Sequence, residues 1–147
     1  MAATAFMFTS APMRAYSGSI GALGDAAGTT HVCLVAAAGS VETHQEDWTG
    51  YGDITNEVTG TGYTAGGQAL ASRALTGTNR VTKFDAADTI WGTSTITAKY
   101  AVVYSYSPGS SLIAAYDFGT EYASSNGSFT LTWGAGGLFT DTVAGTA

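Results

Sequence analysis

The chain of 147 residues has the size of one ordinary domain, and we expect a single β-domain over residues 1–147. Its formal charge of −6 and its pI near 4.5 leave no basic surface to neutralise phosphates, so nucleic acid and anionic membranes are poor partners. The longest apolar runs fall well short of the roughly 20 residues that a membrane-spanning helix needs.

Apolar residues recur mostly with the period of a strand. The one candidate helix, about Ser17–Ala27, contains three glycines, each of which costs about 1 kcal/mol relative to alanine in a helix. Short apolar runs bounded by turn residues predict strands along the rest of the chain. These predicted strands are Thr4–Phe8, His31–Ala38, Glu57–Gly60, Gln68–Leu75, Arg80–Phe84, Thr93–Tyr106, Leu112–Phe118, Ser128–Trp133 and Leu138–Val143.

The last strands have the pattern of a meander. Asn126-Gly127 stands directly before Ser128–Trp133 and supplies the two positive-φ positions that a tight hairpin prefers, which predicts Leu112–Phe118 as the partner strand. Leu112–Phe118 is apolar on both faces, as in a central strand. Strict alternation along Thr93–Tyr106 would place Ile96 and Tyr100 on the same face.

About eight or nine short strands separated by glycine-rich turns predict an all-β fold. We expect an antiparallel β-sandwich or jelly-roll-like domain, with at most one short N-terminal helix. The sequence does not give the strand order. The glycine-rich segment 49–67 is long for a loop, which predicts either a functional loop or an extended arm.

Few residues of the kinds that build active sites are present. The soft metal ligands are His31, Cys33 and His44, and their spacing does not match a four-ligand zinc site. Asp85 and Asp88 lack the alternating oxygen ligands of a calcium loop. No Gly-x-Ser-x-Gly elbow occurs, and the glycines of 60–67 have the wrong spacing for a dinucleotide fingerprint. We therefore expect no enzyme, no catalytic residue, no metal and no cofactor.

Aromatic residues near a polar cluster are the candidate ligand or partner contacts. The cluster comprises Glu42, His44, Glu46 and Asp47 and is typical of a solvated loop whose neighbouring aromatics pack against a sheet. Trp48 and Tyr51 follow it, and Trp48 is the better candidate to stack on a sugar ring. Tyr63 lies among glycines that fit a tight turn. A carbohydrate-binding β-sandwich is thus one alternative function.

Five phrases occur in series between Thr30 and Phe139. They are Asn56–Gly67 (NEVTGTGYTAGG), Phe84–Trp91 (FDAADTIW), Ser94–Ala98 (STITA), Leu112–Gly119 (LIAAYDFG) and Ser124–Trp133 (SSNGSFTLTW). In this order they resemble a widespread family of small virion proteins of tailed bacteriophages, encoded among the head and tail structural genes. The first thirty residues depart from the family pattern, with glycines where the relatives are more helical.

The resemblance implies a structural protein of the virion without enzymatic activity. Small size, one domain and an acidic surface favour a capsid decoration or cement protein, with other copies of itself, as a trimer or cluster, and the major capsid protein as partners. The alternative is a tail, collar, baseplate or fibre component that contacts tail structural proteins. A decoration protein would stabilise the shell by mass action, because it binds only the assembled state.

Overall fold

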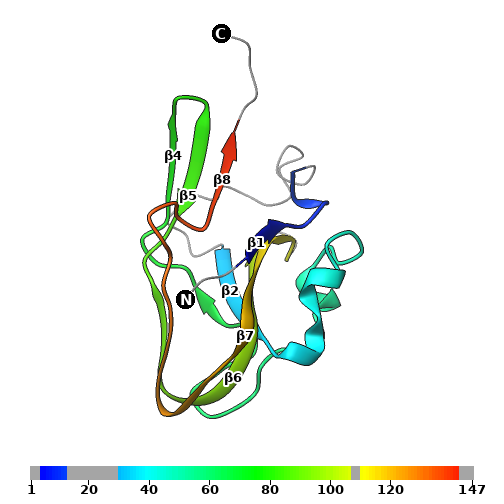
Figure 1. Ribbon diagram of the computed structural model, residues 1–147, viewed down its shortest axis with the longest axis vertical. Helices are drawn as coiled ribbons and strands as arrows, with labels where there is room; N and C mark the ends of the chain where they lie inside the picture. The colour runs from blue at the N-terminus through cyan, green and yellow to red at the C-terminus, as the bar shows by residue number, and fades with distance from the viewer. Residues whose placement is uncertain (1–3, 13–29, 107–109, 143–147) are drawn as a thin grey trace.

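The protein has an all-β, antiparallel, sandwich-like fold, as predicted (Figure 1). The computed structural model describes residues 4–12, 30–106 and 110–142, so the predicted helix Ser17–Ala27 lies outside the described residues. The described strands are β1 Thr4–Met7, β2 Thr30–Val35, β3 Gln68–Ala69, β4 Ala74–Thr78, β5 Val81–Asp85, β6 Thr89–Ser105, β7 Leu112–Leu131 and β8 Phe139–Thr142. Short 3-10 helices are η1 Ala37–Gly39, η2 Val41–Thr43 and η3 Tyr51–Asp53.

The strands form two sheets. The larger has the order β1-β7-β6-β2-β3, and the long β6–β7 hairpin is its centre. The smaller has the order β4-β5-β8 and extends from one end of the molecule, at the top of Figure 1, while β6 and β7 curve at the opposite end. Because β7 lies between β1 and β6, the prediction that Leu112–Phe118 forms a central strand is confirmed.

The predicted hairpin at Asn126-Gly127 is wrong. These residues lie inside β7, which continues from Leu112 to Leu131. Gly127 pairs with Ser94 of β6, and the register shifts on both sides of Ser94, so the dipeptide forms part of a bulge instead of a turn. Asn126 keeps the positive φ, 49°, that the hairpin argument assigned to it. The residues of β7 after the dipeptide consequently pair with the start of β6, where Trp91 pairs with Phe129.

Irregular pairing also determines which core each side chain of β6 enters. A third register shift lies between Ala98 and Tyr100. There β6 advances by two residues while β7 advances by five, from Asp117 to Tyr122, and such an interruption of the ladder breaks the regular alternation of side chains. Ile96 and Ala98 therefore lie in one core and Tyr100 in the other, in contrast to the strict alternation that the sequence predicts.

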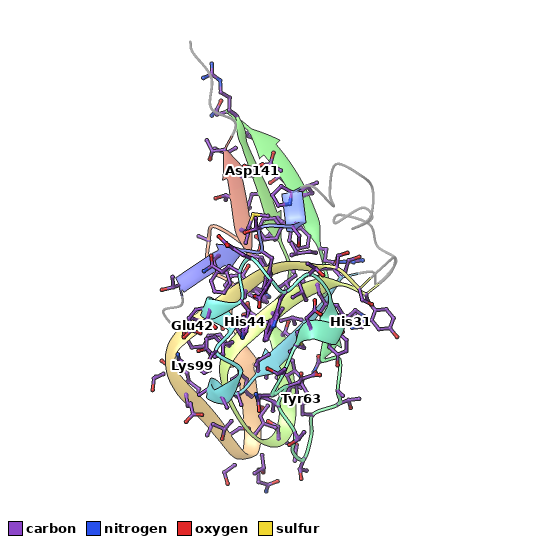
Figure 2. All side chains as sticks on the ribbon, turned by 90° about the vertical axis from the view of Figure 1, so that its right-hand side faces the viewer. His31, Glu42, His44, Tyr63, Lys99 and Asp141 are labelled. Atoms are coloured by element: carbon purple, nitrogen blue, oxygen red, sulfur yellow. The ribbon has the colours of Figure 1, made fainter. Side chains whose placement is uncertain are left out.

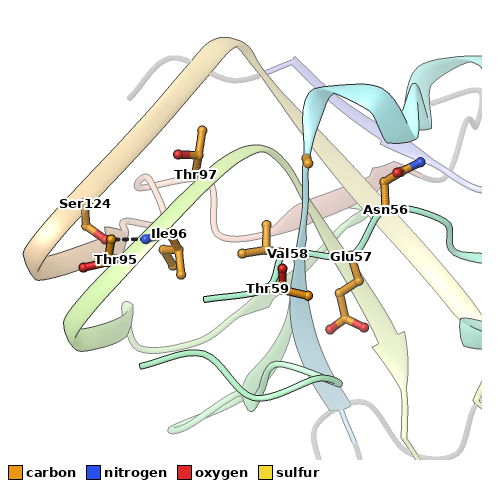
Figure 3. Close-up of a pocket in the computed structure, with 9 residues that line it drawn as sticks. Asn56, Glu57, Val58, Thr59, Thr95, Ile96, Thr97 and Ser124 are labelled. Atoms are coloured by element: carbon orange, nitrogen blue, oxygen red, sulfur yellow. Dashed lines mark hydrogen bonds between the residues drawn. The ribbon is translucent and has the colours of Figure 1, made fainter. Parts of the chain in front are cut away.

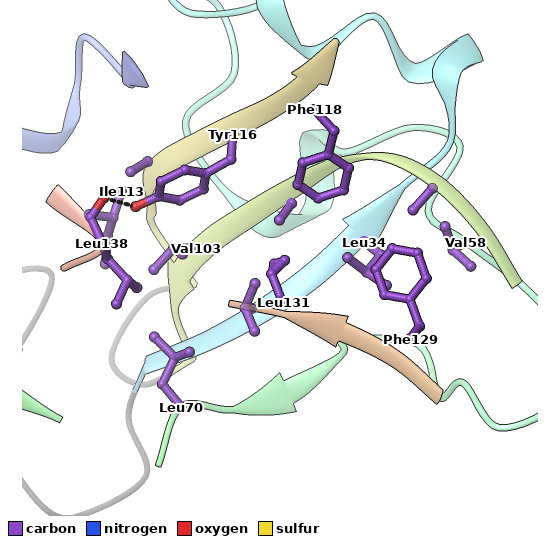
Figure 4. Packing of buried hydrophobic residues seen from close by; sticks show 14 of the residues in the cluster. Leu34, Val58, Leu70, Val103, Ile113, Tyr116, Phe118, Phe129, Leu131 and Leu138 are labelled. Carbon is purple, nitrogen blue, oxygen red and sulfur yellow. Dashed lines mark hydrogen bonds between the residues drawn. The ribbon is translucent and has the colours of Figure 1, made fainter. Parts of the chain in front are cut away.

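Two apolar cores lie on opposite faces of the larger sheet. In the first, the curved end of the β6–β7 hairpin packs over the middle of the sheet, so that Phe129 and Leu131 face Leu34 and Val103 (Figure 4). The Tyr116 hydroxyl donates to the carbonyl oxygen of Leu138, which fastens the chain before β8 to β7. The second core contains Phe8, Cys33, Val35, Val41, Trp48, Tyr100, Val102, Tyr104, Leu112 and Ala115.

Other predicted strands also have different bounds in the structure. Glu57–Gly60 forms only one isolated bridge, between Glu57 and Val35. The predicted strand His31–Ala38 ends at Val35 and continues into η1. The predicted strand Gln68–Leu75 is split into β3 and β4, and Ser72, with a positive φ of 50°, lies in the bend between them.

Segment 49–67 lies along the larger sheet and does not extend from it as an arm. The Leu112 amide donates to the carbonyl of Thr49 at 3.0 Å, and the Val58 amide donates to that of Leu34 at 2.9 Å. At the far end of the segment, a Cβ atom on Gly67 would lie 1.9 Å from the Val32 carbonyl oxygen. The glycine is therefore required where this loop meets β2. Within the described ranges, no helix is both long and apolar enough to cross a membrane.

Candidate functional site

Glu57 is the centre of the most connected polar cluster in segment 49–67. Its Oε2 accepts a hydrogen bond from the Tyr51 hydroxyl at 2.5 Å. Its Oε1 accepts one from the Tyr63 hydroxyl and one from the Gly66 amide, both at 2.7 Å. Two of the three candidate contact residues of the sequence analysis therefore meet on one carboxylate.

The same cluster is fastened to the sheet beneath it. The Tyr63 hydroxyl accepts a hydrogen bond from the Leu34 amide of β2 at 2.9 Å. The Tyr104 hydroxyl of β6 donates to the Gly66 carbonyl at 2.7 Å, and its ring stacks on Tyr51 with centroids 4.8 Å apart. Glu57 and its partners thus hold a long loop on two strands that are distant from it in sequence.

Burial keeps the phenols of this cluster protonated. It is the main cause that raises the pKa of Tyr51, Tyr63 and Tyr104 well above the ordinary value, and the Glu57 charge adds to it. Burial likewise raises the pKa of the neighbouring Cys33 thiol. At neutral pH the phenols of Tyr51 and Tyr63 therefore donate to Glu57, and the carboxylate accepts three hydrogen bonds. This arrangement positions a loop and contains no nucleophile activated by a base.

Trp48 lies apart from this cluster. Its side chain is 6% exposed and belongs to the second core, and its ring stacks on His44 with centroids 4.3 Å apart and an interplanar angle of 1°. Little of the indole surface faces solvent. The interpretation of a solvated loop whose aromatics pack against the sheet describes this segment better than a stacking platform for a sugar.

Glu42, His44 and Lys99, which Figure 2 labels, belong to a group of polar contacts at residues 42–47. His44 Nδ1 lies 3.1 Å from Asp47. Lys99 Nζ lies 3.8 Å from Glu42 and 3.6 Å from Asp117, and it donates to the Tyr100 hydroxyl at 2.8 Å. A hydrogen bond from Tyr100 is the main cause that lowers the pKa of Glu42. Glu42 and Asp47 thus have local partners and lowered pKa values, which suits a surface loop and not a general acid.

An open groove of about 390 Å³ lies beside Glu57, between the loop and the start of β6 (Figure 3). Hydroxyl and amide side chains line most of it, and the Ile96 amide donates to the Ser124 hydroxyl at 3.4 Å across its wall. Its lining residues are Ala36, Asn56, Glu57, Val58, Thr59, Thr95, Ile96, Thr97 and Ser124. The groove offers polar contacts, and the three hydrogen bonds of Glu57 already use the one ionisable group in it.

The weaker metal candidates have local partners. Asp85 accepts a hydrogen bond from the Ala86 amide and pairs with Lys83 at 3.2 Å, and Asp88 accepts one from the Trp133 amide. His31 stacks on Tyr106 with centroids 4.2 Å apart. Within the part of the chain that the structure describes, no group of three or more His, Cys, Asp or Glu residues has the geometry to hold a metal ion.

Sequence reasoning did not identify Glu57 as the centre of a cluster. One signal was present, because Tyr51 and Tyr63 each lie six residues from it in the chain. That spacing matches neither a helix nor a strand period, so only the path of the loop brings the three residues together. No protein-family model matches this chain, and no curated protein or solved structure matches it either.

Proposed function

We propose that this chain is a non-enzymatic structural protein of a tailed-bacteriophage virion and, more specifically, a decoration protein that binds the capsid exterior and stabilises the shell. Its partners are the major capsid protein and other copies of itself. The first support is the resemblance of five phrases, in order, to a family of phage virion proteins.

The observation that carries the proposal is that these phrases build the scaffold. Asn56–Gly67 is the loop that Glu57 and its tyrosines hold on the sheet. At Gly60, a Cβ atom would lie 2.3 Å from the Thr95 carbonyl oxygen, so the glycine permits close packing of loop on strand. Phe84–Trp91 and Ser124–Trp133 supply Phe84, Trp91, Phe129 and Leu131 to the first core. The phrases that carry the resemblance are thus the ones that pack the first core and hold the loop on the sheet.

The surface suits repeated contact with a shell. Charged residues make up 11% of the chain, and the small sheet β4-β5-β8 extends from the body with most of its residues exposed. A protein with this surface stabilises the state to which it binds by RT ln(1 + [L]/Kd), where [L] is its free concentration. No reacting group is required for this function.

Shells that lack this protein test the proposal. Purified protein added to them should co-sediment with the shells, saturate at a fixed number of copies per shell, and raise the temperature at which the shells break. Shells already carrying the protein are the control and should bind no more. Binding to isolated tails, with none to shells, would replace the decoration role by a tail role. Binding to neither particle would overturn the virion proposal.

A further inference from the structure

The small sheet β4-β5-β8 has very little core of its own. Phe84 is the one buried residue of its three strands, and Phe139 packs beside it with ring centroids 5.2 Å apart. Both residues lie at the end of the sheet nearest the first core. Leu75, which pairs with Phe84, is nevertheless 51% exposed, and Val81 at the far end of the sheet is 36% exposed. A sheet of three short strands with two solvent-facing sides has little burial to offset the entropy lost on ordering it.

Both edges of this sheet are open. β4 and β8 each pair with β5, and neither pairs with any other strand among the described residues. β4, with the sequence Ala-Leu-Thr-Gly-Thr, contains none of the prolines or charges that normally protect an edge strand from pairing with another chain. The open edge of β4 therefore has the features of a strand that accepts a partner strand.

Charge distinguishes the possible partners. Arg73 directly precedes β4, and Arg80 lies in the turn that follows it, whereas β8 contains the exposed Asp141. Figure 2 shows Asp141 on the extended part of the small sheet. An antiparallel pair of two β4 strands would bring Arg73 of each copy beside Arg80 of the other. Two paired β8 strands would bring the two Asp141 carboxylates together, and like charges at such positions destabilise a strand pair.

We propose that the edge of β4 in one copy pairs with the edge of β8 in a second copy, which places Arg80 of the first near Asp141 of the second. β4 and β8 both run antiparallel to β5, so they point in the same direction, and the new pair is parallel. Each copy then offers one edge of each kind. Such a head-to-tail contact closes into a ring when the rotation permits, and the small sheets become one continuous sheet.

This inference deepens the proposed function, since it names the surface through which copies of the protein meet. It also explains the sheet itself, because pairing satisfies the open backbone groups of both edges and covers part of Leu75, which is exposed on the edge strand β4. Parallel pairing between different copies occurs without a crossover connection, so the short turns of this chain do not prevent it.

The test measures the mass of purified protein by light scattering and by native mass spectrometry. The wild-type chain should be a ring-sized oligomer. Asp141→Arg and Arg80→Asp should each lose the oligomer, because each places like charges across the interface. Glu121→Arg makes the same charge change on an exposed residue of β7, outside the small sheet, and should keep the oligomer. Far-ultraviolet circular dichroism verifies that each variant is folded.

Mixing the two monomeric variants separates an intermolecular pair from one within a chain. In a mixture, the unchanged Arg80 of one variant meets the unchanged Asp141 of the other, and the two reversed residues meet each other. Hetero-oligomers containing both variants should therefore form. A monomeric wild type, single variants that stay oligomeric, or a mixture without hetero-oligomers would each overturn the inference. Because no shell is present, these outcomes leave the shell-binding test of the proposed function unaffected.

Discussion

Replacing Glu57 by alanine should destabilise the fold more than any other single substitution of an acidic residue. The change removes the acceptor of three hydrogen bonds, of 2.5, 2.7 and 2.7 Å, from Tyr51, Tyr63 and Gly66. A hydrogen bond to a charged group contributes about 1.5–3 kcal/mol. Glu57 is half-buried, so water replaces part of this loss. We therefore expect Glu57→Ala to lower the free energy of unfolding by about 2–4 kcal/mol.

Equilibrium urea unfolding, followed by tryptophan fluorescence at one fixed protein concentration, measures this loss. Glu57→Gln keeps the volume and one acceptor oxygen and should lose about 1–2 kcal/mol. Glu121→Ala, an exposed acid on β7, is the control and should change stability by less than about 0.5 kcal/mol. A double-mutant cycle with Tyr63→Phe should give a coupling of about 0.5–3 kcal/mol. A loss for Glu57→Ala as small as that of the control would refute the role of this cluster in holding the loop.

Other substitutions and conditions test separate parts of the structure. Gly67→Ala should cost about 3 kcal/mol or more, because its Cβ would lie 1.9 Å from the Val32 carbonyl oxygen at a φ of +70°, whereas Gly134→Ala meets open space and should be almost neutral in thermal unfolding. The Cys33 thiol is buried with a raised pKa, so an aromatic disulfide reagent should react with it only in denaturant; fast reaction of the native protein would contradict this. Burial raises the pKa of Tyr63 and Tyr116 above the value near 10 of the unfolded chain, so the stability they contribute is complete below about pH 10 and is lost as the pH rises further. An absorbance titration should accordingly show tyrosines that ionise only as the protein unfolds, and smooth ionisation of every tyrosine in the folded state would oppose this.

Strands could be predicted from this sequence because alternation is local. Leu112–Phe118 is apolar on both faces, and the structure places it between two strands, as expected. Bulges could not be predicted in the same way. The shift between Ala98 and Tyr100 depends on how β6 pairs with β7, and nothing in the residues of β6 alone requires it. The residues that interrupt the ladder lie in β7, between Asp117 and Tyr122, so β6 keeps the sequence pattern of one strand while the faces of its side chains change.

The Asn126-Gly127 dipeptide predicted the backbone conformation of Asn126 correctly but predicted a hairpin turn where the structure has a bulge. Asn126 adopts the positive φ that the dipeptide favours. The residues before it, however, continue to pair with β6, as in the Thr97–Ala123 pair, because the opposing strand is long enough to extend past the bulge. Tertiary pairing therefore decided between a turn and a bulge, which have similar backbone requirements at this position.

The candidate site was only partly accessible to sequence reasoning. Tyr51 and Tyr63 were recognised as aromatics in an unusual loop, but their common acceptor Glu57 was not, because the loop path that joins them has no periodic signature. Trp48 follows a polar run, which favours exposure, yet the stacked His44 ring covers it. The polar neighbours of Trp48 thus lie above a buried ring, an arrangement that only the packing of the second core determines.

Imaging the intact phage particle by electron cryomicroscopy tests the central claim most directly. The account predicts repeated density on the outer surface of the capsid into which this fold fits, with the β4-β5-β8 sheets of neighbouring copies in contact. Particles whose shell carries no such density, and whose tail carries none either, would contradict the proposal that this chain is a structural protein of the virion.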